Sequence, residues 1–334
     1  MNKPQRKEAL SWLGENLLNL PGLENAIEKA GQINPFFTGE FCMLSLKSIT
    51  SWMQENNLTG WMEKIPEDKI PQTVGLITAG NLPLAGWHDL MSIFASGHHC
   101  RFRLSSQDEV LPAFLLASLN KEFPASAPYF EKADRLNGVS ALIASGSNAS
   151  TAQFEYYFKG IPQIIRKSRS SIGLIYGFEN PNELSPLCDD IMQYFGMGCR
   201  SISKILVPEN YDFSAFFESL EKYRYLTGHH RYQNNAIYHK AIFLMNGDPF
   251  LENDMLVVRE NSQLFSPPGV LHYQFYQSME EAARIMEQHR KELQCIVSHQ
   301  GQFPGSIPFG TAQQPAIHDY ADGIDTLAFL GSLG

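Results

Sequence analysis

The spacing of apolar positions along the chain changes near residue 70. Before this point they recur every three or four residues, as at Leu10, Leu13 and Leu17, which predicts helices with breaks at Pro21-Gly22 and near Pro35. Beyond it, short apolar runs that end in glycine, such as TVGLITAG (73–80), alternate with helical patterns such as GWHDLMSIFASG (86–97). This alternation predicts an α/β protein whose parallel strands are covered by helices on both faces.

The same alternation continues to about residue 300. Further helices are predicted over 109–123, 147–160, 185–196 and 278–293, the third of them with Ser185 as its cap and Pro186 in its first turn. Further strands are predicted at 98–104, 138–146, 162–168, 171–177, 201–208, HKAIFLMNG (239–247), 254–260, 270–276 and 294–298. The stretch FPGSIPFGTAQQP (303–315) is too rich in proline and glycine to be regular.

Composition excludes several classes of protein. The chain has 334 residues and a formal net charge of −9, with no block of lysine or arginine, so a general nucleic-acid binder is not expected. Neither a secretory leader nor an apolar run of membrane-spanning length is found, which predicts a cytoplasmic protein without a membrane span. The five cysteines are scattered without a C-x-x-C pair, and no H-E-x-x-H is present, so no disulfide framework and no metal site are predicted.

One cysteine lies in a distinctive setting. In GMGCRS (196–201) a helical run stops at Gly196, and Cys199 follows between Gly198 and Arg200. A glycine allows a substrate to approach the backbone closely, and an arginine favours the thiolate, which is the nucleophile that transfers acyl groups near neutral pH. The alternative is an inert structural thiol.

Two segments that follow predicted strands could bind a ligand. In TAGNLPL (78–84), Asn81 could donate a hydrogen bond to an oxyanion or simply cap the next helix. In SGSNAS (145–150), small residues open a helix, which suits a phosphate group. Ser150 and Gln153 also fit a plain capping box.

Taken together, GLITAGNLPLAG, CRFRLSSQD, ALIASGSNAST and FGMGCRS, in this order from residue 73 onward, resemble the aldehyde dehydrogenase superfamily. Within it they are most similar to the LuxC-like fatty-acyl-CoA and acyl-thioester reductases. The resemblance implies an aldehyde-dehydrogenase-like fold with two Rossmann-like parallel-sheet domains. It divides the chain into an N-terminal helical segment (1–72), an NAD(P)-binding domain (73–170), a catalytic domain (171–303) and an irregular segment that packs back on the body (304–334).

The resemblance also implies roles for individual residues. Cys199 corresponds to the acyl-accepting nucleophile, and Asn81 to the amide that binds the oxyanion together with the backbone N–H of the cysteine. Two arginines in CRFR (100–103) favour NADPH over NADH, because they suit an additional phosphate. The implied cofactor-binding residues are Thr78, Ala79, Gly80, Arg103, Ser105, Ser106, Ser145, Gly146, Ser147 and Glu260.

The segment that would carry a hydrolytic base has no carboxylate, and this bears on the predicted reaction. The segment IIRKSRSSIGLIYG (164–177), where hydrolytic members of the superfamily carry a glutamate base, has no carboxylate. Without a base to activate water, an acyl-cysteine would persist and could be reduced. The predicted activity is therefore NAD(P)H-dependent reduction of an acyl-CoA or acyl-protein thioester to the aldehyde. In this segment Arg166, Lys167 and Arg169 either meet phosphates or are solvated.

Two alternatives stay open. One is an acyl-phosphate reductase, and the other is an acyl-carrying or cofactor-binding subunit that needs a partner for turnover. The resemblance further implies an acyl-donating protein partner and a homo-oligomer.

Overall fold

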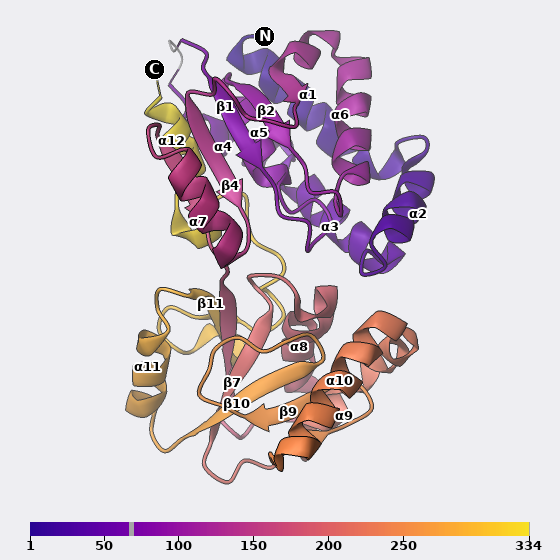
Figure 1. Cartoon of the computed structure of the whole chain (residues 1–334), viewed down its shortest axis with the longest axis vertical. Helices are drawn as coiled ribbons and strands as arrows, with labels where there is room; N and C mark the ends of the chain where they lie inside the picture. Colours follow the sequence, from indigo (N-terminus) through magenta and orange to yellow (C-terminus); the bar gives the residue numbers. More distant parts are fainter. Residues whose placement is uncertain (67–69, 334) are drawn as a thin grey trace. The chain divides into compact units, whose positions relative to one another are not determined.

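The computed structural model describes residues 1–66 and 70–333 and divides the chain into two compact units (Figure 1). Unit 1 consists of Met1–Ser168 together with Pro315–Gly334, and unit 2 consists of Arg169–Gln314. The chain therefore leaves unit 1, builds unit 2 and returns to unit 1 for its last residues.

Unit 1 begins with the predicted helices, which are α1 (Lys3–Asn16), α2 (Leu23–Ile33), α3 (Gly39–Trp52) and α4 (Glu55–Met62). Helix α1 starts with a capping box, in which the Asn2 side chain accepts from the Gln5 amide and the Gln5 side chain accepts from the Asn2 amide. Gly22, with φ of 89°, provides the left-handed turn before α2. Thr38 caps α3 by accepting from the amide of Phe41.

The sheet of unit 1 is fully parallel, as predicted, with the order β3-β2-β1-β4-β5. Its strands are β1 (Thr73–Ile77), β2 (His99–Arg103), β3 (Phe130–Lys132), β4 (Ala141–Ser145) and β5 (Gln163–Arg166). The helices that belong to it are α5 (Trp87–Ser96), α6 (Val110–Glu122), α7 (Asn148–Tyr157) and α12 (Thr326–Gly331). Because β1 lies between β2 and β4, the loops after these three strands meet at one edge of the sheet.

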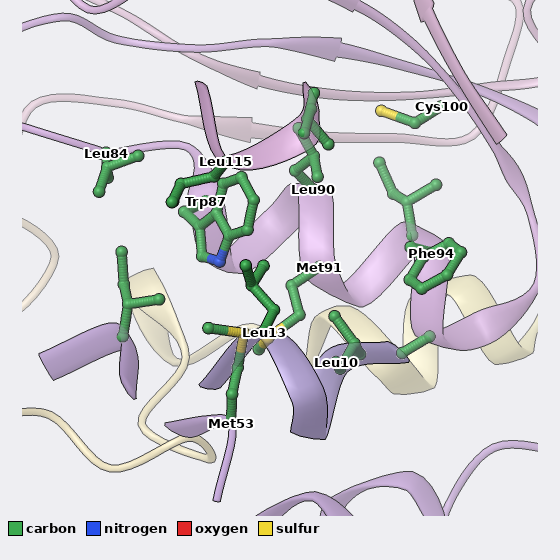
Figure 2. Close-up of a cluster of buried hydrophobic side chains, with 14 of the residues drawn as sticks. Leu10, Leu13, Met53, Leu84, Trp87, Leu90, Met91, Phe94, Cys100 and Leu115 are labelled. Carbon is green, nitrogen blue, oxygen red and sulfur yellow. The ribbon is translucent and has the colours of Figure 1, made fainter. Parts of the chain in front are cut away.

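Helix α5 forms the centre of the apolar core of unit 1 (Figure 2). Every residue of this helix except His88 is buried, which is the pattern of a helix enclosed on all sides. Leu10 and Leu13 of α1 join Trp87, Leu90 and related side chains in this cluster. The helical N-terminal segment is therefore an integral part of unit 1.

Unit 2 contains a seven-stranded sheet with the order β12-β11-β6-β7-β10-β9-β8, in which only the β8–β9 pair is antiparallel. Four helices accompany it, α8 (Pro181–Met192), α9 (Ser214–Ser219), α10 (His230–Asn246) and α11 (Met279–Gln288). The strands are β6 (Ser170–Leu174), β7 (Ile202–Pro208), β8 (Leu251–Glu252), β9 (Val257–Glu260), β10 (Val270–Tyr276), β11 (Leu293–Ser298) and β12 (Ile307–Pro308). In the described residues of both units, no helix is long and apolar enough to cross a membrane.

The strand predicted at 239–247 is wrong, because these residues belong to α10. The helix buries Tyr232 and Phe243 on one face, yet Tyr238 and Leu244 on another face are 61% and 63% exposed. With apolar residues on both faces, the helical period is hidden and a short apolar run imitates a buried strand.

The predicted start of α8 is also wrong. The helix begins at Pro181, and the Asn180 side chain accepts from the amides of Asn182 and Glu183. Glu183 completes a capping box, whereas Pro186 lies inside the helix. The combination of Asn, Pro and Glu at 180–183 outweighs the weaker Ser-Pro signal five residues later.

Candidate active site

Cys199 lies in unit 2, three residues before β7 begins at Ile202 and therefore at the amino-terminal edge of the sheet. It is half-buried, whereas Cys42, Cys100 and Cys188 are buried. The turn before it contains Tyr194 and Phe195, both with φ above 50°, and Gly196 with φ of 72°. Left-handed backbone at a residue other than glycine costs about 1–2 kcal/mol, so tertiary packing must hold this turn in place.

Hydrogen bonds fix the position of the cysteine within the turn. The amide of Gly198 donates to Ser201 Oγ at 3.0 Å, and the side-chain amide of Gln313 donates to the same hydroxyl at 3.1 Å. On the other side, Ser171 Oγ donates to the carbonyl oxygen of Cys199 at 3.1 Å. The thiol is thus carried by backbone that is tied to β6 and to the segment after β12.

A buried carboxylate beneath this region was not predicted from the sequence. Asp190 of α8 accepts from the amides of Gly310 at 2.7 Å and Ala312 at 3.0 Å. Burial raises the pKa of Asp190 to about 7, and the two amides oppose this rise. An acidic residue between Leu187 and Ile191, on the apolar face of a predicted helix, is the signal that could have revealed it.

The predicted cofactor residues of the first two strands lie together at the carboxyl edge of the sheet in unit 1. Thr78 follows β1, and its hydroxyl accepts from the amide of Ser105, just after β2, at 3.2 Å. A Cβ on Gly80 would lie 2.2 Å from Ser105 Oγ, so this close approach requires glycine. Ala79 and Ser106 belong to the same two loops, and Arg103 ends β2 with an exposed side chain.

The predicted phosphate segment comes to the same edge from β4. Ser145 ends this strand, Gly146 follows, and Ser147 caps α7 by accepting from the amide of Ser150 at 3.3 Å. The capping box proposed for Ser150 and Gln153 is therefore wrong, since the helix begins one turn earlier. The positive end of the α7 dipole and these small residues suit an anionic group.

Glu260, Asn81 and Arg101 remain to be placed. Glu260 ends β9 in unit 2 and is exposed, whereas the other predicted cofactor residues belong to unit 1. Asn81 is exposed in the loop after β1. Arg101, the other arginine of CRFR, forms an ion pair with Glu131 at 2.9 Å. Arg103, at the carboxyl end of β2, has no ion pair with any residue that the structure describes.

Both expectations for the side chain of Arg166, contact with a phosphate and exposure to solvent, are wrong. It is 6% exposed, and its guanidinium binds both carboxylate oxygens of Asp89, at 2.7 and 3.3 Å. Lys167 pairs with Glu155 on the surface, and Arg169 donates to the carbonyl of Leu293. Asp89, an acid inside an otherwise apolar helix, was missed by the sequence analysis.

In the described part of the chain, no group of three or more His, Cys, Asp or Glu side chains is arranged to hold a metal ion. The predicted residues therefore fall into two separate features, a half-buried thiol in unit 2 and a polar edge of small residues with Arg103 in unit 1.

Comparison with solved structures identifies an aldehyde-dehydrogenase-like fold. The Rhodopseudomonas palustris propionaldehyde dehydrogenase with bound propionyl-CoA matches 90% of this chain and 76% of its own, with 12% identity and a TM-score of 0.61. A propionaldehyde dehydrogenase of a Clostridium phytofermentans fucose-utilisation bacterial microcompartment matches 97% of this chain and 91% of its own, with 10% identity and a TM-score of 0.61.

A third structure is the *P. syringae* AldA indole-3-acetaldehyde dehydrogenase in complex with NAD+ and IAA. It matches 92% of this chain and 74% of its own, with 11% identity and a TM-score of 0.65. No protein-family model matches the sequence. No curated protein sequence matches it either.

Proposed function

We propose that this protein reduces an acyl thioester, either acyl-CoA or an acyl-protein, to the aldehyde through an acyl-cysteine on Cys199, with NADPH as the preferred reductant. The observation that carries the proposal is the setting of Cys199. It is a half-buried thiol on a glycine-flanked turn, next to Arg200, in an aldehyde-dehydrogenase-like fold. A structural neighbour with bound propionyl-CoA supports the thioester substrate class.

In the proposed reaction the Cys199 thiolate attacks the thioester carbonyl, and the leaving thiol departs. The resemblance assigns the backbone N–H of Cys199 and the side-chain amide of Asn81 as the donors to the oxyanion. The hydrogen bond from Ser171 to the Cys199 carbonyl holds the turn while charge develops on the substrate.

Residues 164–177 contain no carboxylate that could serve as a base and release the acyl group as an acid, and Arg166 of this segment is held by the buried Asp89. An acyl-cysteine in this setting is protected from water and is available for reduction or for exchange with another thiol.

The edge of the unit 1 sheet fits a dinucleotide. Gly80 lets the side chain of Ser105 pack directly against the loop after β1, and Gly146 and Ser147 present the start of α7 to the pyrophosphate. Arg103 is the cation that we assign to the additional phosphate of NADPH. When bound, a reduced nicotinamide supplies the hydride that converts the acyl thioester to the aldehyde.

The test is oxidation of NADPH and of NADH by the purified protein over acyl-CoAs of increasing chain length, with acyl phosphates in parallel. We expect acyl-CoA-dependent oxidation that Cys199→Ala abolishes and that the matched variant Cys295→Ser retains. Mass spectrometry should find the acyl group on Cys199 when the reductant is omitted.

Other outcomes select the alternatives. Turnover with acyl phosphates alone would make the protein an acyl-phosphate reductase. Acyl-enzyme without oxidation of either nucleotide would make it an acyl carrier that needs a protein partner. Unchanged turnover by Cys199→Ala would overturn the mechanism.

A further inference from the structure

Two half-buried cysteines of unit 2 contact one hydroxyl group, Cys199 through its backbone carbonyl and Cys295 through its thiol, and the two cysteines also interact electrostatically. Ser171 Oγ donates to the carbonyl oxygen of Cys199 at 3.1 Å and lies 3.1 Å from the Sγ of Cys295. The same oxygen accepts from the backbone amide of Cys295 at 3.2 Å. Since the hydroxyl has one proton, which goes to the Cys199 carbonyl, the S–H of Cys295 is the donor to Ser171.

The sheet explains why residues so distant in sequence come together. Strand β6, which carries Ser171, lies between β7 and β11, so the residues at the start of these two strands flank it. The ladder between β6 and β11 changes register between Leu293 and Ile296. Cys295 lies in this irregularity, and such a bulge redirects side chains out of the regular alternation.

We propose that Cys199 and Cys295 are joined by a reversible disulfide when the protein is exposed to hydrogen peroxide. The thiolate of Cys199 attacks a peroxide oxygen, and the O–O bond breaks to give a sulfenic acid and hydroxide, which takes a proton from solvent to become water. The Cys295 sulfur then attacks the sulfenic sulfur, and its proton leaves with the hydroxyl group as a second water. The two sulfurs are oxidised, and the peroxide is reduced.

The surroundings assign different roles to the two thiols. Burial raises the pKa of Cys295 to about 11, with Ser171 and Arg200 opposing the rise and the neighbouring Cys199 adding to it. Cys295 therefore rests as a thiol and does not compete for peroxide or for the acyl group. The other three cysteines are buried, and the pKa of each is raised mainly by burial, to about 12 for Cys42 and Cys188.

The consequence for activity rests on the proposed function, because a disulfide at Cys199 removes the nucleophile. The disulfide itself does not depend on that function. Peptide mapping therefore tests the thiol pair even if the protein reduces no thioester, and turnover tests the function even if no disulfide forms.

The experiment exposes the reduced full-length protein to hydrogen peroxide, blocks the remaining thiols, digests the protein and maps the cross-linked peptides by mass spectrometry. We expect one dominant link, between Cys199 and Cys295, that dithiothreitol removes. Cys188→Ser, a matched change at a buried thiol, should leave the link intact. Cys295→Ser should abolish it and leave Cys199 as sulfinic and sulfonic acid.

A wild-type protein in which peroxide converts Cys199 to sulfinic acid without a link to Cys295 would overturn the proposal. This outcome needs no variant, so instability of a variant cannot obscure it. Ser171→Ala provides a second measurement, because loss of the shared hydroxyl should slow formation of the link while leaving both thiols present. An equal rate in this variant would show that the hydroxyl does not position the pair.

Discussion

The guanidinium of Arg166, at the end of β5, forms a two-point contact with the carboxylate of Asp89 in α5, and both side chains are buried. The same guanidinium donates to the carbonyl of Ala321 and to the hydroxyl of Thr326. An ion pair with this many partners connects the sheet, the central helix and the returning C-terminal segment of unit 1.

Loss of this ion pair is expected to destabilise unit 1. Asp89→Asn leaves the Arg166 charge buried without its partner, which costs about 3–5 kcal/mol. All four tryptophans of the chain lie in unit 1, so equilibrium urea unfolding followed by tryptophan fluorescence reports on this unit. Glu131→Gln, which removes the exposed partner of Arg101, should cost no more than about 1 kcal/mol. Equal effects of the two changes would contradict a structural role for the buried pair.

The stability of unit 1 is expected to fall as the pH rises toward 8. Burial raises the pKa of Asp108 from 3.8 to about 8, and the amides of Leu84 and Ala85 oppose the rise without reaching the carboxyl oxygens in hydrogen-bond geometry. The folded state therefore holds this proton more tightly than the unfolded state. The resulting stability is complete below pH 3.8 and is lost as the pH passes through 8.

The control for this pH dependence is Asp108→Asn, which cannot ionise. Its unfolding midpoint, measured by tryptophan fluorescence between pH 5 and 9, should fall less steeply than that of the wild type. Parallel curves for the two proteins would exclude Asp108 as the source.

Glycine at position 80 is expected to be required for NADPH binding. In Gly80→Ala the new methyl group would lie 2.2 Å from Ser105 Oγ and 2.6 Å from its Cβ, so the loop must move. Overpacking of this kind costs about 1–3 kcal/mol, which corresponds to a rise of about 5- to 150-fold in the Kd for NADPH if the bound loop conformation carries the whole cost. In Gly160→Ala nothing lies within 4 Å of the new methyl group, so its Kd should match the wild type. Unchanged affinity in Gly80→Ala would remove this loop from the proposed cofactor site.

The choice between NADPH and NADH is expected to depend on Arg103. Arg103→Gln should weaken NADPH binding roughly tenfold, the scale of a hydrogen bond to a charged group, and leave NADH binding unchanged. Arg101→Gln, on the same strand, should not alter the ratio of the two affinities, because Arg101 is engaged by Glu131 and the carbonyl of Asn137. Fluorescence titration with each nucleotide measures both ratios. An equal loss for NADPH and NADH would mean that Arg103 does not recognise the additional phosphate.

The parallel architecture could be predicted because its strands and helices are marked by patterns within short stretches of sequence. Apolar runs such as 73–77 and 141–145 are short, end near glycine or small residues and are followed by helical patterns. Local signals failed where tertiary contacts decide the outcome. The apolar residues of α10 on its exposed face hid the helical period, and the competing Ser-Pro pair displaced the predicted start of α8.

The candidate site was predicted only in part, for a related reason. Cys199 could be found because glycine and arginine flank it in the sequence. The contact of Ser171 with Cys295 joins positions 124 residues apart and depends on the order of the strands, which no local pattern contains. The same holds for Arg166 and Asp89, whose charges neutralise each other only after the chain has folded.

The return of the chain to unit 1 has a consequence for its synthesis on the ribosome. Leu327 and Leu330 of α12 are buried in the core of unit 1, and Thr326 contacts Arg166. Residues 1–168 therefore leave the ribosome before α12, which supplies part of their apolar core. All of unit 2 is translated between these two parts of unit 1. The nascent residues 1–168 are left exposed to chaperones and proteases until residues 315–334 have emerged.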